Sequence, residues 1–352
     1  DKEQGQAIIQ LMFKHQPLVP DEYKNTVAFL SVQYIKSLAS NVFNARLNEA
    51  AQKGDCPFVA AYADDDSYIL SKTMDAFNLV IIPKPGKDKE AIEAVMTEVK
   101  RVHEFGFTAT EVMRASEEIL SGLEATYNNR DKQKNAFYVP QYVRNFLEND
   151  PIPSIEDEYN MYKMMSQQMM QAQAAAPAAS SFFNELTART DTNFVCMAMY
   201  PEKEGVAVPT ADQFKQAIAN AAKAKVEAYV DNVKNEPLIT NLPKKGRIKK
   251  ETKADFGYTC WTLDNGARVF FKKTDYNDAE VQFIATSMGG ENKIVTKDRV
   301  NAKLMPTVLN STGLGNFTST ELQKKLAGKQ VSCGFDLGMI TENLSGSSTP
   351  KD

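Results

Sequence analysis

The stretch SVQYIKSLASNVFNARLNEAAQ, residues 31–52, decides the fold of this chain. Its apolar side chains recur at steps of three and four residues, which places them on one face of a helix: Val32, Tyr34, Ile35, Leu38, Val42, Phe43 and Leu47. Two short runs of strand type follow, CPFVAAYA at 56–63 and DAFNLVIIP at 75–83. A long amphipathic helix before a pair of strands predicts an α+β fold, an antiparallel sheet with helices packed on one face.

Three consecutive aspartates, Asp64, Asp65 and Asp66, separate the two strand-type runs. Ionised carboxylates are costly to bury, and aspartate is frequent in turns. We therefore predict that residues 63–66 form a turn between the two strands.

Further segments of the chain show the same mixture of helix and strand patterns. Thr108-x-x-Glu111 and Thr210-x-x-Gln213 have the spacing of capping boxes, which satisfy free backbone N–H groups where a helix begins. Strands are expected at residues 6–14 and 193–200, and helices at residues 88–104, 108–127, 132–148, 154–170 and 210–233.

Composition and charge are those of an ordinary globular protein. The 352 residues are enough for two domains, and 43% hydrophobic with 24% charged residues is a normal balance for a packed fold. A formal net charge of −4 removes any general case for nucleic-acid binding. The apolar runs are far shorter than the roughly 18–20 residues that a membrane-spanning helix needs. We expect neither a nucleic-acid partner nor a membrane span.

A change of composition divides the chain into domains. Residues 1–233 form one domain, and residues 234–255 follow with prolines, a glycine and a cluster of lysines but no apolar periodicity, which is typical of a hinge linker. Residues 256–352 include a strong hairpin signal, Asp264-Asn265-Gly266, and repeat the order of the first domain: strand, long helix, short helical piece, two strands. We expect them to be the N-terminal part of a second, similar domain that is truncated.

No catalytic signature is present in the sequence itself. The 2 histidines, His15 and His103, have no second histidine at metal-ligand spacing, and Gly-x-Ser-x-Gly does not occur. The 4 cysteines are scattered, which favours buried free thiols. We predict no catalytic residue and no metal ligand in this chain.

An ordered series of motifs, which together cover essentially the whole chain, resembles one known family. The first motifs are similar to the second domain of the pitrilysin/insulinase family of zinc metallopeptidases: Asn44-Ala-Arg-Leu-Asn-Glu49, Pro57-Phe58 and Gly106-Phe-Thr-x-Thr-Glu111. The later motifs resemble the start of that family's third domain: Trp261-x-Leu-Asp-Asn-Gly266, Gly289-Gly290 and the run from Gly313 to Gly328.

This resemblance implies a metallohydrolase-like fold of the pitrilysin and mitochondrial processing peptidase type. It implies four similar α+β domains, paired into two halves that enclose a peptide chamber. The zinc motif, His-x-x-Glu-His, would lie in a domain upstream of Asp1, so zinc would be a cofactor of the whole enzyme and not of this chain. The implied partners are a peptide substrate and the other domains of the same polypeptide.

The third-domain segment departs from the zinc motif of the family's catalytic domains. There the zinc helix reads Ala-His-x-x-Glu-His, and here the corresponding run is Ala302-Lys-Leu-Met-Pro-Thr307. Lys303 and Thr307 stand at the ligand positions and Pro306 at the position of the base. A lysine ammonium has no lone pair for a metal, threonine is a poor ligand, and proline has no proton to move. We expect this chain to be inactive alone, to form chamber wall and to join the two halves.

The resemblance also implies a peptide-binding edge. In the family the amino-terminal part of a bound peptide can add to a sheet edge of the second domain through backbone hydrogen bonds. The matching strand begins with Phe58, Val59, Ala60, Ala61 and Tyr62. Two other interpretations stay open: a wholly non-catalytic scaffold with this fold, and a free-standing peptide-binding module.

Overall fold

The computed structural model describes residues 3–71, 73–190 and 192–352. The chain divides into two compact units. The first comprises the chain up to Tyr127, residues Asn135–Asn232 and residues Ala327–Lys329. The second comprises Asn128–Lys134, Val233–Leu326 and Gln330–Asp352.

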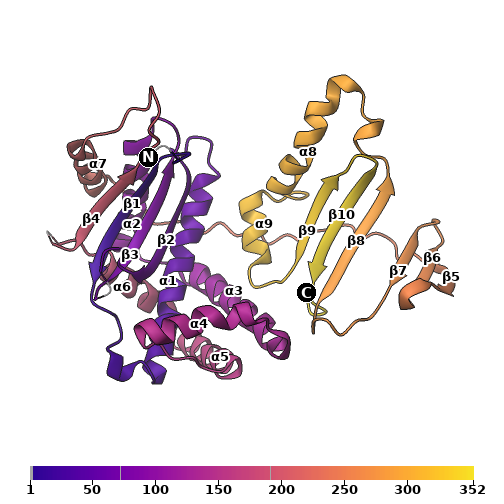
Figure 1. Cartoon of the computed structure of the whole chain (residues 1–352), viewed down its shortest axis with the longest axis horizontal. Helices are drawn as coiled ribbons and strands as arrows, with labels where there is room; N and C mark the ends of the chain where they lie inside the picture. Colours follow the sequence, from indigo (N-terminus) through magenta and orange to yellow (C-terminus); the bar gives the residue numbers. More distant parts are fainter. Residues whose placement is uncertain (1–2, 72, 191) are drawn as a thin grey trace. The chain divides into compact units, whose positions relative to one another are not determined.

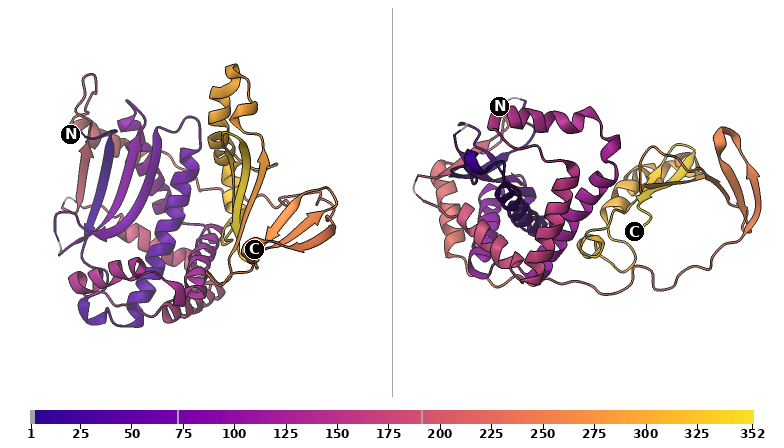
Figure 2. Two further views of the ribbon diagram at one scale, coloured as in Figure 1. Left: turned by 45° about the vertical axis from the view of Figure 1, so that its right-hand side comes forward. Right: turned by 90° about the horizontal axis from the view of Figure 1, so that it is seen from below.

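The first unit is built on a four-stranded sheet with the order β2-β3-β1-β4, in which every neighbouring pair is antiparallel. Its strands are β1 (Ile8–His15), β2 (Phe58–Ser67), β3 (Asp75–Pro83) and β4 (Phe194–Met199). Helices cover one face of this sheet, among them α1 (Val27–Ala51), α2 (Asp88–Phe105) and α6 (Ala175–Leu186), as Figures 1 and 2 show. The predicted α+β class, with helices on one face of an antiparallel sheet, is confirmed.

Helix α1 forms because its apolar spacing matches the helical period, and its buried face packs on the sheet. Tyr34, Leu38 and Phe43 are fully buried, as are Phe13 of β1 and Phe77 of β3 in the same core cluster. Each such side chain contributes about 1.5–3 kcal/mol when it leaves water. The helix begins after Thr26, whose hydroxyl accepts a hydrogen bond from the backbone N–H of Ala28 at 3.2 Å. The helix that the sequence predicts here is therefore present, and it begins slightly earlier.

The remaining helices of this region begin at side-chain caps or at breaks in the chain. They are α3 (Ala109–Asn128), α4 (Asn135–Glu148), α5 (Ile155–Gln171) and α7 (Ala211–Lys223). Both predicted capping boxes are present: Thr108 exchanges hydrogen bonds with Glu111, and Thr210 with Gln213. The predicted extension of the last helix to residue 233 is wrong, because α7 ends at Lys223 and the chain continues without helix.

The predicted turn at residues 63–66 is also wrong, because β2 continues through the aspartates to Ser67. The strand tolerates Asp65 because its carboxylate is paired on both sides. One oxygen lies 2.6 Å from Nε2 of His15, and the other lies 2.7 Å from Nζ of Lys36. A charge with two opposite partners escapes most of the cost of burial.

The second unit contains a sheet with the order β8-β10-β9, again antiparallel throughout. Its strands are β8 (Val281–Met288), β9 (Ser332–Leu337) and β10 (Thr341–Ser348), and α8 (Arg299–Ser311) and α9 (Ser319–Leu326) precede β9. In chain order, β8, α8, β9 and β10 correspond to β1, α1, β2 and β3, and the sheet orders correspond as well. The predicted structural repeat is thus confirmed.

The second unit also holds a smaller sheet with the order β5-β6-β7. Its strands are β5 (Ile248–Lys253), β6 (Thr259–Leu263) and β7 (Arg268–Phe271). The predicted hairpin at Asp264-Asn265-Gly266 joins β6 to β7, with Gly266 at a φ of +86°. Strand β5 was not expected, since its residues fall within the predicted linker. Short 3₁₀ turns lie at Asp21–Tyr23, Arg130–Lys132, Asp255–Gly257, Glu291–Lys293 and Thr296–Asp298.

Candidate functional site

The positions compared with the zinc motif lie together on α8. Lys303, Pro306 and Thr307 are spaced by three and four residues and so share one face of the helix, with Lys303 and Thr307 exposed. Their chemistry does not fit zinc, because an ammonium, a pyrrolidine ring and a hydroxyl offer the metal neither an imidazole nor a carboxylate. Within the described parts of the chain, no group of three histidine, cysteine, aspartate or glutamate side chains could hold a metal ion.

The predicted peptide-binding residues begin β2, which is an edge strand of its sheet. A register shift lies between Phe58 and Ala60, so the strand is irregular at its start. Val59 and Tyr62 expose 58% and 48% of their surface, and Phe58 and Ala61 are buried in the core cluster. The structure therefore keeps these five residues on one strand but gives them two different environments.

The outer side of β2 is occupied at Ala63 by a side chain of α1. The Asn44 carboxamide donates from Nδ2 to the carbonyl oxygen of Ala63 at 2.9 Å and accepts from the backbone N–H of Ala63 at 2.6 Å. Because Asn44 takes both groups, the backbone of Ala63 points away from β3. In an antiparallel pair this direction alternates along the strand. The backbone N–H and C=O groups of Ala61 therefore also point away from β3, whereas those of Tyr62 point toward its β3 partner Val80.

The same contact recurs in the second unit. There the Asn310 carboxamide of α8 donates to the carbonyl oxygen of Phe335 at 3.0 Å and accepts from the Phe335 backbone N–H at 2.9 Å. Phe335 lies on β9, which is the edge strand that corresponds to β2. A helix-borne asparagine thus pairs with the outer side of the edge strand in both units.

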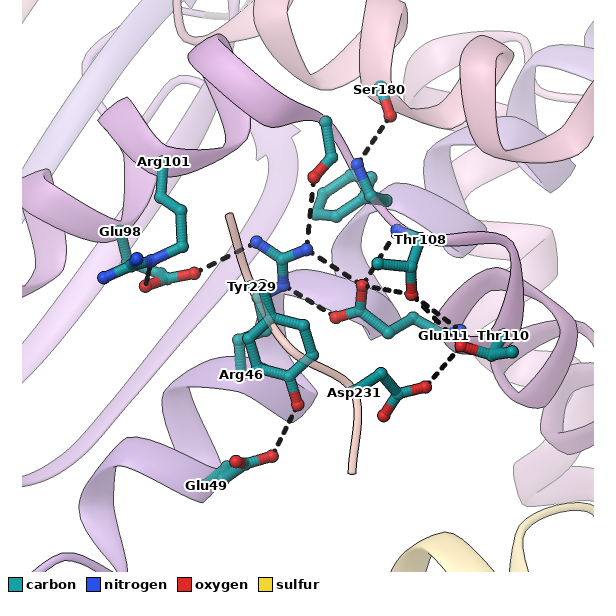
Figure 3. A network of polar contacts seen from close by, with 12 residues as sticks. Arg46, Glu49, Glu98, Arg101, Thr108, Thr110, Glu111, Ser180, Tyr229 and Asp231 are labelled. Carbon is teal, nitrogen blue, oxygen red and sulfur yellow. Dashed lines mark hydrogen bonds and ion pairs between the residues drawn. The ribbon is translucent and has the colours of Figure 1, made fainter. Parts of the chain in front are cut away.

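A buried ionic network fixes the helices behind β2 (Figure 3). The Arg46 guanidinium donates from Nε and Nη2 to the two carboxylate oxygens of Glu111 at 2.7 and 2.9 Å, and from Nη2 to the carbonyl of Gly106 at 3.2 Å. Its side chain is 2% exposed, and the ring of Tyr229 lies 4.4 Å from the guanidinium carbon. Removing one partner of such a buried pair costs about 3–5 kcal/mol, so the network holds α1 and α3 in place.

The same network anchors the extended chain that follows α7. Arg114 makes two hydrogen bonds of 2.8 Å to the carboxylate of Asp231, and the Tyr229 hydroxyl donates to Glu49 at 2.6 Å. Lys100 donates to the carbonyls of Ala222 and Ala224 at 2.9 and 2.7 Å. The sequence did not indicate these contacts. The one feature that could have predicted them is the position of Arg46 in a helix whose apolar residues are buried, because a buried arginine needs acidic partners.

Among the described residues, no helix combines the length and the apolar character that crossing a membrane requires.

Two curated proteins with similar sequences are named as zinc proteases. The zinc protease PQQL-like protein of Arabidopsis thaliana is 24% identical over 252 residues, which cover 70% of this chain and 25% of that protein. The probable zinc protease PqqL of Escherichia coli (strain K12) is 22% identical over 312 residues, which cover 88% of this chain and 32% of that protein. The chain thus spans about a quarter to a third of the length of the curated relatives that it matches. No family model matches the sequence.

Solved structures share the fold. The periplasmic protease PqqL of Escherichia coli matches with a TM-score of 0.53 and 21% identity, over 99% of this chain and 37% of that one. A mutant of the ferredoxin protease FusC, in complex with Arabidopsis ferredoxin, matches with a TM-score of 0.54 and 16% identity, over 100% of this chain and 38% of that one. A "predicted insulinase family protease" of Yersinia pestis matches with a TM-score of 0.50 and 13% identity, over 63% of this chain and 44% of that one. The motif series, the curated relatives and the shared fold together support a fragment of the pitrilysin/insulinase family.

Proposed function

We propose that this chain is a non-catalytic segment of a zinc-dependent metalloendopeptidase, in which it forms chamber wall and joins the two halves. The observation that carries the proposal is the face of α8 with Lys303, Pro306 and Thr307, the residues that the sequence comparison aligns with the zinc motif. The fold is similar to that of solved proteases, and these three side chains offer zinc no imidazole or carboxylate. Zinc chemistry then belongs to another domain of the same polypeptide.

The proposed partner is a peptide that pairs with the outer side of β2. Backbone hydrogen bonds along a sheet edge are insensitive to sequence, which suits an enzyme that takes many peptides. The structure of the ferredoxin protease FusC, which holds ferredoxin in a complex, supports a protein substrate for this fold. In this proposal the exposed side chains of Val59 and Tyr62 flank the bound peptide.

Metal analysis of the purified 352-residue chain tests the non-catalytic assignment. We expect no stoichiometric zinc after dialysis against zinc-containing buffer and no cleavage of a fluorescent peptide mixture. The full-length protein serves as the control, and we expect it to hold zinc and to cleave the same peptides in a chelator-sensitive way. One tightly held zinc per chain together with chelator-sensitive cleavage by the chain alone would overturn the assignment. A full-length protein without zinc or cleavage would favour the scaffold interpretation.

A further inference from the structure

We propose that residues 224–231 are a strap, and that the ion pair between Arg114 and Asp231 is the clasp that fastens this strap to the first unit. The purpose of the strap rests on the joining role proposed above, because the strap sets the point at which the connection to the second unit leaves the first. Its basis is a series of contacts along a segment that belongs to no helix or strand.

The main chain of the strap is held although it forms no regular structure. Between α7 and β5 the chain, which the structure describes in full, contains no helix or strand. Lys100 of α2 donates from Nζ to the carbonyl oxygens of Ala222 and Ala224 at 2.9 and 2.7 Å, and the Arg101 guanidinium donates to that of Glu227. These charged donors replace the partners that a helix or a sheet would give the carbonyls. Helix α2 thus holds the first half of the strap.

Tyr229 fixes the second half of the strap on α1 (Figure 3). The centre of its ring lies 4.4 Å from the guanidinium carbon of Arg46, and its hydroxyl donates to Glu49 at 2.6 Å. Arg46 is itself bound by Glu111 through two hydrogen bonds, so the ring packs on a side chain that is held in place.

The clasp fastens the end of the strap to α3. The Arg114 guanidinium donates two hydrogen bonds of 2.8 Å to the two carboxylate oxygens of Asp231, and the Thr110 hydroxyl donates a further one to the same carboxylate. The side chains of Arg114 and Asp231 are 15% and 5% exposed. Such a fork fixes direction as well as distance, and its partial burial reduces screening by salt. Loss of this contact should therefore release the end of the strap.

Two residues separate the clasp from a contact inside the second unit. Lys234 donates to the carbonyl oxygen of Asn316 at 2.6 Å and lies 5.1 Å from the centre of the Phe317 ring, and all three residues belong to the second unit. Asn232 and Val233, which follow the clasp, are exposed. With the clasp closed, the connection at this crossing of the chain is these two residues. With the strap released, the strap becomes part of the connection and lengthens it.

Trypsin cleavage after Lys225 tests the strap in the unchanged 352-residue chain. Lys225 is exposed within the strap, and a protease cuts a segment only when the segment leaves its partners, so the rate of this cut measures release. The cuts after Lys244 and Lys245, in the irregular segment before β5, are the internal reference. We expect the cut after Lys225 to be roughly tenfold slower than the reference cuts. Mass spectrometry of timed samples gives both rates.

Asp231→Asn opens the clasp while keeping the size of the side chain. We expect the cut after Lys225 to become roughly tenfold faster and the reference cuts to keep their rates, because the charge-assisted bonds to Arg114 are lost. Glu227→Gln is the matched control, since it makes the same change of charge at an exposed side chain of the strap and keeps the main-chain carbonyl. Its rate of cleavage after Lys225 should equal that of the unchanged chain.

Nuclear magnetic relaxation of the backbone nitrogens gives a second measurement, which needs no protease. In the unchanged chain we expect residues 226–231 to be as rigid as α7. In Asp231→Asn we expect them to gain the fast motion of residues 238–246. Arg114→Lys keeps the charge but loses the fork, and we expect an intermediate release. This variant keeps the test decisive if Asp231→Asn does not fold.

The outcomes separate the strap, the clasp and the proposed function. A slow cut after Lys225 that Asp231→Asn accelerates and Glu227→Gln does not supports both strap and clasp. A cut after Lys225 as fast as the reference cuts in the unchanged chain would overturn the strap. A slow cut that neither Asp231→Asn nor Arg114→Lys accelerates, or that Glu227→Gln accelerates equally, would overturn the clasp. None of these rates depends on zinc or on peptide cleavage, so a failure of the strap is distinguishable from a failure of the non-catalytic assignment.

Discussion

At the scale of single residues, the most informative group is the charged cluster of Asp65 on β2, His15 on β1 and Lys36 on α1. Burial alone would lower the pKa of His15, but its hydrogen bond to Asp65 and the charge of that carboxylate outweigh burial and raise the pKa above 6.5. Burial would likewise raise the pKa of Asp65, but His15 and the Lys36 ammonium lower it below 3.8. Each partner therefore keeps the other charged, and this is how an aspartate stays inside a strand.

The raised pKa of His15 predicts a pH-dependent stability. A folded pKa above the unfolded one stabilises the protein fully below the unfolded value of about 6.5, and the contribution is lost as pH rises through the folded value. We therefore expect His15→Gln to lose more unfolding free energy at about pH 5.5 than at about pH 9. Urea unfolding followed by circular dichroism at both pH values measures this difference.

His103 provides the opposite control for that experiment. Burial lowers the pKa of His103, so in the folded protein its neutral ring, 2.7 Å from the Thr187 hydroxyl, is favoured. The cost of His103→Gln should therefore shrink as the pH falls. A His15→Gln cost that is equal at both pH values, or larger at the alkaline one, would contradict the ion pair.

Residue-scale features explain where sequence reasoning reached its limit. Three adjacent aspartates predict a turn when the charges are considered alone, and the partners of Asp65 lie 50 residues earlier at His15 and on another element at Lys36. The contacts of Asn44 with Ala63 and of Asn310 with Phe335 could not be predicted either, because the sequence of a helix does not show which strand its polar residue will contact. The comparison of Lys303, Pro306 and Thr307 with a zinc motif stays a prediction, and the structure adds that the three residues lie on one helix.

At the scale of elements, periodicity predicted those that bury one face and missed those that do not. Helices α1 and α2 follow their apolar spacing closely. All residues of β5 are exposed, so no alternation marks it, and its pairing with β6 makes it a strand. Helix α7 ends before the predicted residue because the Lys100 ammonium donates hydrogen bonds to the carbonyl oxygens at its end, and Arg114 binds Asp231 in the chain that follows.

The irregular segment between Asp231, which Arg114 binds, and β5 should be the first to be cut by a protease. Lys244, Lys245 and Arg247 are exposed and lie outside helices and strands, whereas Lys249 and Lys250 belong to β5. We expect limited trypsin digestion to cut first at residues 244–247 and more slowly within β5. Mass spectrometry of the early fragments locates the cuts. First cuts between residues 88 and 148 would show that the proposed domain boundary is misplaced.

At the scale of the whole molecule, the two units are unequal in their cores. The core cluster draws its members from residues 9–221, all in the first unit. Among the described residues, the buried hydrophobic side chains of the second unit are Ala302 and Phe317. The sequence predicted the repeat and the resemblance to the family from motif order. The depth of each core depends on how many elements surround it, and motif order does not contain that information.

This inequality predicts two unfolding transitions. The single tryptophan, Trp261, lies on β6 in the second unit, so its fluorescence reports that unit alone. We expect the urea midpoint of the fluorescence curve to lie below the midpoint of the far-ultraviolet circular dichroism curve. The helices of the first unit dominate the circular dichroism signal. Coincident curves from the two probes would show instead that the units unfold as one.

The repeated asparagine contact has a consequence for how such chains can diversify. The connection between helix and edge strand differs in length between the two units, yet the same pair of hydrogen bonds forms in each. In the second unit the connection from α8 to β9 contains the whole of α9, so the contact forms with an inserted helix as well as without one, and this connection is a place where insertions of new sequence are tolerated. Recognition loops could be added there, in evolution or by design, while the sheet beside them keeps its register.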